Sequence, residues 1–235
     1  MAKVGRIEVF LQSMRVIITA ATHLEMAGCA KKALPLFKHT KLDISFHATG
    51  IGALAAAVEL TKLALTEQPD LIVQMGIAGC YPKTAPLGKV WVIDSETIAD
   101  LGVREKGLFK DLFDSGLQKD NQAPFKKRKL PNPFLKVYNI LHTPVANAVT
   151  INEITTSIKR INEIVVHHSP ILESMEGAAL HYVGGITKIP FIQIRAVSNY
   201  VGERNKAKWK LQESIEQLEA YILTYLVTLE NGLKN

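Results

Sequence analysis

Two short segments of the chain carry the side chains that are best suited to chemistry. Residues 173–179 read Glu-Ser-Met-Glu-Gly-Ala-Ala, and residues 195–200 read Arg-Ala-Val-Ser-Asn-Tyr. The apolar run 189–194 between them predicts a buried strand that leads into the second segment. Because ligands of open α/β sheets bind just outside the carboxyl ends of the strands, we expect a binding site here.

Glu176 stands at the start of a predicted helix of small residues. A carboxylate in this position is stabilised by the helix dipole. Its two oxygens match a pair of neighbouring hydroxyl groups, such as those of a ribose, and Met175 beside it offers a soft apolar surface for a sugar. These two residues therefore predict a sugar-binding position.

Glu25 follows the first predicted strand, at 15–20, and is expected at the same edge of the sheet. An alternative interpretation is a solvated glutamate in the first turn of a helix, favoured by the dipole. Glycine-bearing segments follow two further strands, at 49–52 and 76–79, and predict turns where backbone can approach a ligand. Neither segment matches the dinucleotide-binding or phosphate-binding glycine patterns.

Short apolar runs alternate with helical patterns along the chain. This alternation predicts one α/β domain with a twisted, mainly parallel central sheet flanked by helices. The polar stretch 104–133 is expected to be a lid or an interface element. The predicted strands are 15–20, 42–48, 71–75, 90–93, 138–141 and 191–197, and the predicted helices are 53–66, 152–162, 176–186 and 206–229.

Residues 1–13 precede Met14 and are expected to be a leader or a short N-terminal extension, so that the domain spans 14–235. No apolar run reaches the ~18 residues that a membrane span needs. Cys29 and Cys80 lack metal or redox spacing and are expected in the core. We therefore predict a cytoplasmic protein that needs no membrane and no metal.

The net charge of +6 raises the question of nucleic-acid binding. Much of the excess comes from the basic run 126–129, in a stretch that contains proline and asparagine. A charge run in a loop is usually a solvated surface, and no aromatic-rich RNA signature or helix-turn-helix accompanies it. We therefore predict no nucleic-acid partner.

The two reactive segments, together with Gly76-Ile77-Ala78-Gly79 and Thr49-Gly50-Ile51-Gly52 in their order along the chain, resemble the nucleoside phosphorylase and nucleosidase superfamily. Within it, the string 173–179 with 198–205 and Trp209 resembles the futalosine hydrolase family, and 99–102 adds support. The resemblance implies a twisted sheet flanked by helices, a homodimer or larger oligomer, and no cofactor. It also implies the reaction, which is hydrolysis of futalosine to hypoxanthine and dehypoxanthine futalosine on a bacterial route to menaquinone.

The same resemblance implies a role for each matching side chain. Glu25 is expected to act as general base on water, and Arg195 to orient Glu25 and that water. Glu176 and Met175 are expected to bind the sugar, and Ser198 to fix Asn199 or the base. The base is expected against Ile77, Ala78, Gly79 and Ile151.

Asn199 bears on the choice of base. Relatives that cleave adenine nucleosides have aspartate at this place, whereas an asparagine NH₂ group donates to the 6-oxo oxygen or N7 of hypoxanthine. Two further departures from the adenine-specific pattern are Ile77 in place of a serine and the absence of phenylalanine from 149–152.

Water is favoured over phosphate as the nucleophile, because residues 20–26 contain no arginine or lysine and place Glu25 where phosphate would be repelled. The alternatives are a methylthioadenosine/adenosylhomocysteine nucleosidase and a non-catalytic nucleoside-binding protein of the same fold. The aromatic carboxylate tail of futalosine calls for a recess and a cation, for which Arg104, Arg204 and the run 126–129 are unranked candidates.

Overall fold

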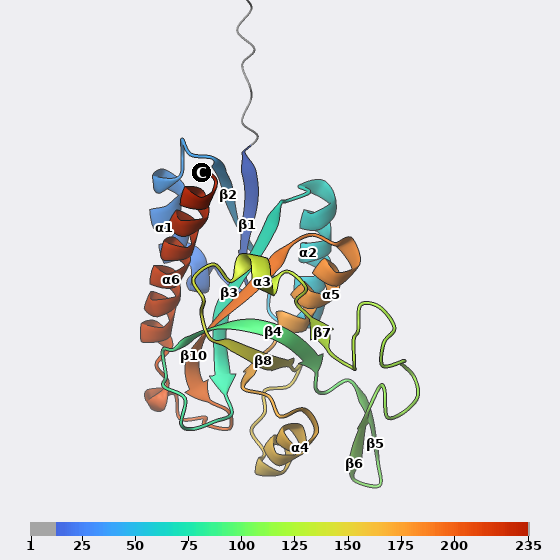
Figure 1. Cartoon of the computed structure of the whole chain (residues 1–235). Helices are drawn as coiled ribbons and strands as arrows, with labels where there is room; N and C mark the ends of the chain where they lie inside the picture. The colour runs from blue at the N-terminus through green and yellow to red at the C-terminus, as the bar shows by residue number, and fades with distance from the viewer. Residues whose placement is uncertain (1–12, 235) are drawn as a thin grey trace, which may run out of the picture.

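A mixed sheet of eight strands forms the centre of the protein in the computed structural model, which describes residues 13–234 (Figure 1). The strand order is β10-β4-β8-β9-β3-β1-β2, with β7 beside β4. β10 also pairs with β3, so the first five strands of that order close into a ring. The strands are β1 (Met14–Ala20), β2 (Leu42–Ala48), β3 (Leu71–Cys80), β4 (Val90–Ile98), β7 (Leu130–Pro131), β8 (Val145–Thr150), β9 (Leu172–Ser174) and β10 (Phe191–Tyr200).

Most strand pairs are parallel, as the sequence predicted. β2, β1, β3 and β10 run parallel in succession, and so do β4, β8 and β9. Antiparallel pairing occurs where β10 meets β4, where β3 meets β9 and where β7 meets β4. The predicted class, a single α/β domain with a mainly parallel sheet and flanking helices, is confirmed.

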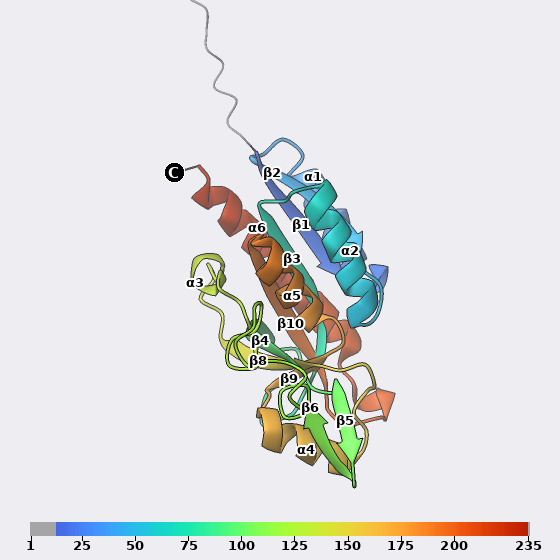
Figure 2. The same ribbon diagram turned by 90° about the vertical axis from the view of Figure 1, so that its right-hand side faces the viewer.

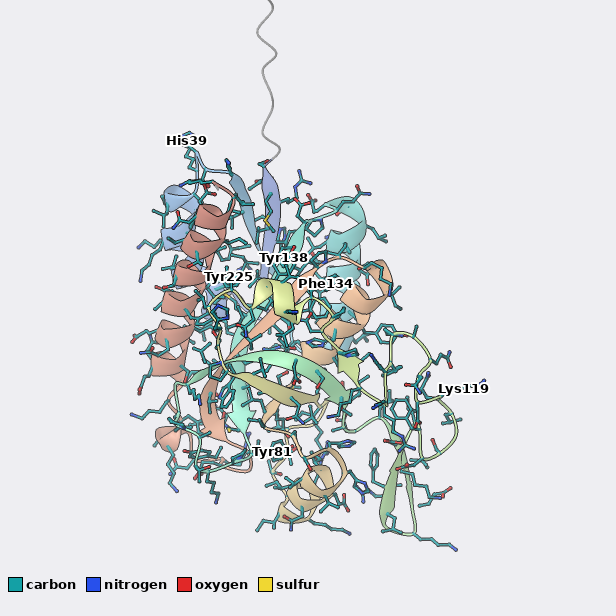
Figure 3. All side chains as sticks on the ribbon, viewed as in Figure 1. His39, Tyr81, Lys119, Phe134, Tyr138 and Tyr225 are labelled. Carbon is teal, nitrogen blue, oxygen red and sulfur yellow. The ribbon has the colours of Figure 1, made fainter. Side chains whose placement is uncertain are left out.

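Helices cover the sheet on opposite sides (Figure 2). α1 (His23–Leu36) and α6 (Leu211–Gly232) pack together, with α6 against β10 and β3, and α2 (Ala53–Thr66) packs on α5 (Gly177–Thr187). The larger core cluster lies beneath α1 and α6, where Tyr225 is fully buried and Tyr138 packs against the cluster (Figure 3). Shorter pieces are α3 (Leu135–Tyr138), α4 (Ile158–His168) and the 3₁₀ turn η1 (Lys206–Lys208).

Several predicted elements were misplaced. The predicted strand 138–141 is wrong, because the end of α3 and a turn occupy it and the strand is β8, further along. The predicted helix at 152–162 begins later, since Asp100 accepts hydrogen bonds from the backbone N–H groups of Asn152 and Glu153 and holds them in a turn. The closing helix begins at Leu211, after η1, and not at Lys206.

The polar stretch 104–133 contains more structure than expected. β5 (Gly102–Glu105) and β6 (Leu108–Asp111) form a hairpin that projects from the body of the protein in Figure 1. Further along, Phe125 packs edge-on against Phe113 and against Tyr182 of α5. The stretch is therefore anchored on α5, and its role as a lid or interface stays a prediction.

Three remaining expectations have different outcomes. Cys29 and Cys80 are buried, as predicted. No helix within residues 13–234 is long and apolar enough to cross a membrane. The predicted leader at 1–13 falls almost wholly on residues 1–12, which, like residue 235, lie outside the described residues.

Candidate active site

A cavity of about 360 Å³ opens where the carboxyl ends of β1, β3 and β10 meet. Every residue predicted for the site lines this cavity except Arg195, which lies beneath it. The lining residues that the sequence predicted are Glu25, Ile77, Ala78, Gly79, Ile151, Met175, Glu176, Ser198 and Asn199.

Glu25 is fixed by three hydrogen bonds. The N–H and the hydroxyl of Thr22 donate to its Oε2 at 3.1 and 3.2 Å, and the Ile77 N–H donates to its Oε1 at 3.1 Å. Glu25 lies in the first turn of α1, as the alternative interpretation expected, but it is buried and not solvated. An ionised carboxylate has about four acceptor positions, which leaves room for one more donor from the cavity.

Glu176 lies at the N-cap of α5, but its carboxylate reaches across to the start of α2. The Gly52 N–H donates to its Oε1 at 3.0 Å. Gly52 is the N-cap of α2 and has φ +91°, a conformation that side chains with a Cβ rarely adopt. The glycine-bearing turn predicted at 49–52 therefore serves to hold this carboxylate at the cavity wall, beside Met175.

Arg195 is almost completely buried beneath the two carboxylates. Its Nη2 donates to Gln74 Oε1 at 2.9 Å, and its Nη1 lies 3.8 Å from Glu176 Oε2. The ion pair is thus with Glu176, and not with Glu25 as the expected orienting role would require. A positive charge here offsets the cost of burying an ionised carboxylate.

Gly76 makes this arrangement possible. A Cβ built on Gly76 would stand 2.2 Å from Arg195 Nη1 and 3.2 Å from Glu25 Oε1. The prediction that 76–79 form a turn is wrong, because β3 continues through them to Cys80. Gly76 is needed because the Arg195 guanidinium and the Glu25 carboxylate occupy the space that a Cβ would take, and not because the chain bends there.

Ser198 and Asn199 form a hydrogen-bonded unit at the end of β10. The Ser198 hydroxyl donates to Asn199 Oδ1 at 2.8 Å, and Asn199 Nδ2 donates to the Tyr200 carbonyl at 3.1 Å. The register of β10 against β3 shifts between Val197 and Asn199, and such irregularities re-aim side chains. The unit fixes which end of the amide is the donor and leaves one N–H of Nδ2 for a ligand.

The other predicted residues form the walls. Ile77, Ala78 and Gly79 supply the end of β3, where Ile77 contributes its N–H to Glu25. Ile151 is buried behind the end of β8. This part of the cavity is apolar and lacks an aromatic stacking partner from 149–152, in keeping with the sequence.

The sequence reasoning assigned no role to a further carboxylate at the cavity. Glu173 is buried and accepts a hydrogen bond from the Tyr81 hydroxyl at 2.6 Å, and burial raises the pKa of Glu173. The available signal was a charged residue a few positions before a helix of small residues. The functional interpretation was given instead to Glu176, three positions later.

A layer of buried polar residues beneath α5 was also missed. Thr150 Oγ1 donates to Glu96 Oε2 at 3.0 Å and accepts from the Ala178 N–H at 2.8 Å, and Gln193 Nε2 donates to Glu96 Oε1 at 2.9 Å. Burial raises the pKa of Glu96 to about 7 and lowers that of His181 to about 4. Glu96 and Gln193 interrupt apolar strands, which was the signal that could have found them.

The arrangement combines a carboxylate that faces the cavity, a carboxylate next to a buried cation and an amide donor around one apolar cavity. Such groups suit a reaction in which positive charge develops on a sugar while the electron pair of the broken bond leaves with a base. Within residues 13–234, no cluster of histidine, cysteine, aspartate and glutamate side chains is suited to hold a metal ion.

Comparisons with known proteins identify the family to which the chain belongs. Residues 35–227 match the family model of the phosphorylase superfamily. Futalosine hydrolase from Streptomyces coelicolor is 30% identical over 178 residues, which cover 73% of either chain. A 5′-methylthioadenosine/S-adenosylhomocysteine nucleosidase from Maridesulfovibrio salexigens is 26% identical over 69% of this chain and 70% of that one.

A solved structure shares the fold. A futalosine hydrolase mutant from Helicobacter pylori superposes with a TM-score of 0.73 at 16% identity, over 91% of this chain and 98% of that one. The match to the superfamily model covers most of the chain. The Streptomyces futalosine hydrolase is 30% identical over 73% of either chain, which places the two proteins in one family. The chain therefore belongs to the phosphorylase superfamily and, within it, to the futalosine hydrolase family.

Proposed function

We propose that this protein hydrolyses the N-ribosidic bond of futalosine, releasing hypoxanthine and dehypoxanthine futalosine on the futalosine route to menaquinone. The observation that carries the proposal is the presence of Glu25, Glu176 and the Ser198–Asn199 unit around one cavity, in a chain of this family. Each group meets one demand of the reaction.

At the sugar, the reaction breaks the bond between C1′ and the purine nitrogen, and the electron pair leaves with the base. Glu176 binds the ribose hydroxyl pair, and its negative charge stabilises the oxocarbenium-like sugar of the transition state. Arg195 and the Gly52 N–H hold this carboxylate in place.

A water molecule then attacks the sugar at C1′. Glu25 accepts a proton from a water molecule while the water oxygen bonds to C1′, a step for which a positioned base contributes about 10²–10⁴-fold in rate. Glu25 returns this proton to solvent, and the hypoxanthine anion, which left with the electron pair of the broken bond, takes up one proton from solvent, so that one water is consumed overall. Since the Thr22 and Ile77 donors hold Glu25, the carboxylate is oriented before substrate binds.

At the base, Asn199 selects for a 6-oxo purine. Its free N–H donates to O6 or N7 of hypoxanthine, both of which are acceptors. The Tyr200 carbonyl prevents the amide from flipping, because a flipped amide would oppose its oxygen to that carbonyl. A site built for one polar pattern rejects the mismatched one strongly.

The assembly and location that we propose are a homodimer in the cytoplasm. α2 and the turn before it expose a row of large apolar side chains, and such patches mark interaction surfaces. They are Ile51, Leu54, Val58 and Leu65, of which Leu54 is 80% exposed. Both cysteines are buried free thiols, the form that a reducing compartment maintains.

The second candidate is a methylthioadenosine/adenosylhomocysteine nucleosidase, favoured by the relative with that name. The same carboxylates would serve it. Asn199 weighs against it, since an amide cannot donate a carboxyl proton to adenine N7.

The test is a substrate panel of futalosine, inosine and methylthioadenosine in phosphate-free buffer, with free base measured by chromatography. Hypoxanthine from futalosine is the expected result. Adenine from methylthioadenosine in its place would select the second candidate. Release that begins only after phosphate is added would identify a phosphorylase, and no release under either condition would leave a nucleoside-binding protein.

A further inference from the structure

One end of the cavity takes no part in the reaction proposed above. It lies between the loop that follows β1 and the connection from β10 to α6. Its surface is apolar and aromatic, and it ends in a guanidinium. The residues are Leu24, Arg204, Trp209, Leu211 and Ile215.

The guanidinium of Arg204 is free to bind a ligand. It is exposed, and its Cζ lies 5.9 Å from the centre of the Trp209 ring. Among residues 13–234 it forms no ion pair, since the neighbouring carboxylate of Glu203 binds Lys208 at 3.0 Å and the Asn205 N–H at 2.8 Å.

Trp209 is a fixed platform beside this cation. Its indole N–H donates to the Glu203 carbonyl at 3.0 Å, and the side chain is half-buried. An aromatic face of this kind stacks on a flat ring. A ligand group that lies on Trp209 thus comes within reach of Arg204.

The charges around the cavity favour an anion at this end alone. In the described chain, Arg204 is the one cation among the lining residues, and the other charged lining residues are carboxylates. Glu25 and Glu176 repel a negative group from the deep part of the cavity, since like charges at short range cost free energy. The carboxylates are Glu25, Glu173, Glu176 and Glu203.

The other cations considered from the sequence do not line this cavity. Arg104 binds Glu163 through both of its terminal nitrogens, at 3.2 and 2.8 Å, and lines a different cavity. Arg128, in the basic run, is paired with Asp114 and Asp120. Neither side chain lines the active-site cavity.

We propose that Arg204 and Trp209 form a subsite for an aromatic ring that carries a carboxylate, attached at the 5′ end of the nucleoside. The ring lies on Trp209, and the carboxylate receives two parallel hydrogen bonds from the planar guanidinium. This proposal rests on the proposed function. The subsite is the part of the protein that distinguishes futalosine from shorter nucleosides.

The experiment removes the charge from either partner. Wild-type protein, Arg204→Gln and Arg204→Lys are assayed with futalosine and with its methyl ester, which keeps the ring and loses the negative charge. We expect Arg204→Gln to lower kcat/KM for futalosine by roughly tenfold, the ratio that corresponds to the free energy of one charge-assisted hydrogen bond. Arg204→Lys should give an intermediate kcat/KM. For the ester, wild type and Arg204→Gln should have the same kcat/KM.

Arg104→Gln is the matched control, a guanidinium removed outside the cavity, and it should leave both substrates unaffected. A thermal melt checks that each variant is folded. If wild type cleaves futalosine and Arg204→Gln cleaves it equally well, the subsite is wrong while the proposed function stands. If wild type releases no hypoxanthine from futalosine, the proposed function itself fails.

Discussion

Among single residues, Asn199 distinguishes the proposed substrate from that of the related adenine nucleosidases. Replacing it by aspartate would set a carboxyl oxygen about where Nδ2 now lies 3.1 Å from the Tyr200 carbonyl. With substrate bound, the single O–H of a protonated carboxyl can donate to N7, and the other carboxyl oxygen can accept from a 6-amino group.

Asn199→Asp should therefore shift selectivity from hypoxanthine toward adenine. The measurement compares kcat/KM for futalosine and for its analogue with adenine in place of hypoxanthine. We expect the ratio to fall at least about tenfold, because mismatched buried polar groups are costly. Asn205→Asp, in the loop that follows, is the control. An unchanged ratio in Asn199→Asp would remove the argument for base selection.

The sequence located the groups that face the cavity better than the groups that hold them. Glu176 and Asn199 were recognisable because each lies beside an element boundary within a distinctive string. The partners Gln74 and Gln193 were not, because a polar residue in a strand has no local partner and its contact depends on which strands become neighbours. Arg195 was identified, yet its pairing with Glu176 depended on the same tertiary information.

Among the elements, β3 must pass closely under the site, and Gly76 is where it does so. Gly76→Ala would force Arg195 Nη1 and Glu25 Oε1 to move, since the new methyl group overlaps the first of them. Overpacking of this kind costs about 1–3 kcal/mol.

We expect Gly76→Ala to lower both the melting temperature and kcat, with kcat falling at least about tenfold because misplaced catalytic groups are strongly penalised. Gly232→Ala is the control, since a Cβ at Gly232 meets nothing within 4 Å. A Gly76→Ala variant with wild-type kcat would mean that the close approach is not needed for catalysis.

Glu96 on β4, which is connected to α5 through Thr150, should make the free energy of unfolding depend on pH. Burial raises the pKa of Glu96 from 4.5 to about 7 in the folded state. Below pH 4.5 the carboxyl is protonated in both states. Between 4.5 and about 7 the unfolded chain loses this proton while the folded chain keeps it, so the free energy of unfolding falls as pH rises.

Glu96→Gln removes this titration and keeps an acceptor oxygen for the Gln193 Nε2 donor. Relative to the variant, wild type should lose roughly 3 kcal/mol across this window, at ~1.4 kcal/mol per pKa unit. Urea unfolding at pH 5 and pH 8 measures the difference, with Glu213→Gln on the surface as control. A difference between wild type and Glu96→Gln that does not change with pH would contradict the account.

Element type was predictable where the apolar pattern was regular along the whole element, as in β2 and α2, whose predicted and observed bounds coincide. It was not predictable for β8 and β9. Both are short, and their pairing with β4 and β3 is set by closure of the strand ring, not by their own sequence. The register that delivers Glu173 and Asn199 to one cavity follows from that closure.

At the scale of the whole molecule, we predict that two copies of the chain assemble through an exposed apolar row. The exposed apolar row on α2 adjoins the cavity, because Ile51 belongs to both. Burying such a patch is favourable by about 25 cal/mol per Å². The proposed homodimer would cover this row.

Leu54→Glu should convert the dimer to a monomer, since a carboxylate cannot be buried there without a partner. Light scattering after size-exclusion chromatography gives the mass directly. Val166→Glu on α4, where the valine is 78% exposed, is a control of matched character and should stay dimeric. A monomeric wild type, or a dimeric Leu54→Glu variant, would place the interface elsewhere or remove it.

The central claim is that this cavity hydrolyses futalosine with Glu25 acting on water. The most direct measurement is the rate of hypoxanthine release from futalosine in phosphate-free buffer, for wild type and Glu25→Gln. We predict steady release by wild type and a rate lower by about 10²–10⁴-fold in the variant, whose amide cannot accept the proton. Equal rates would contradict the role of Glu25, and no hypoxanthine from wild type would contradict the claim as a whole.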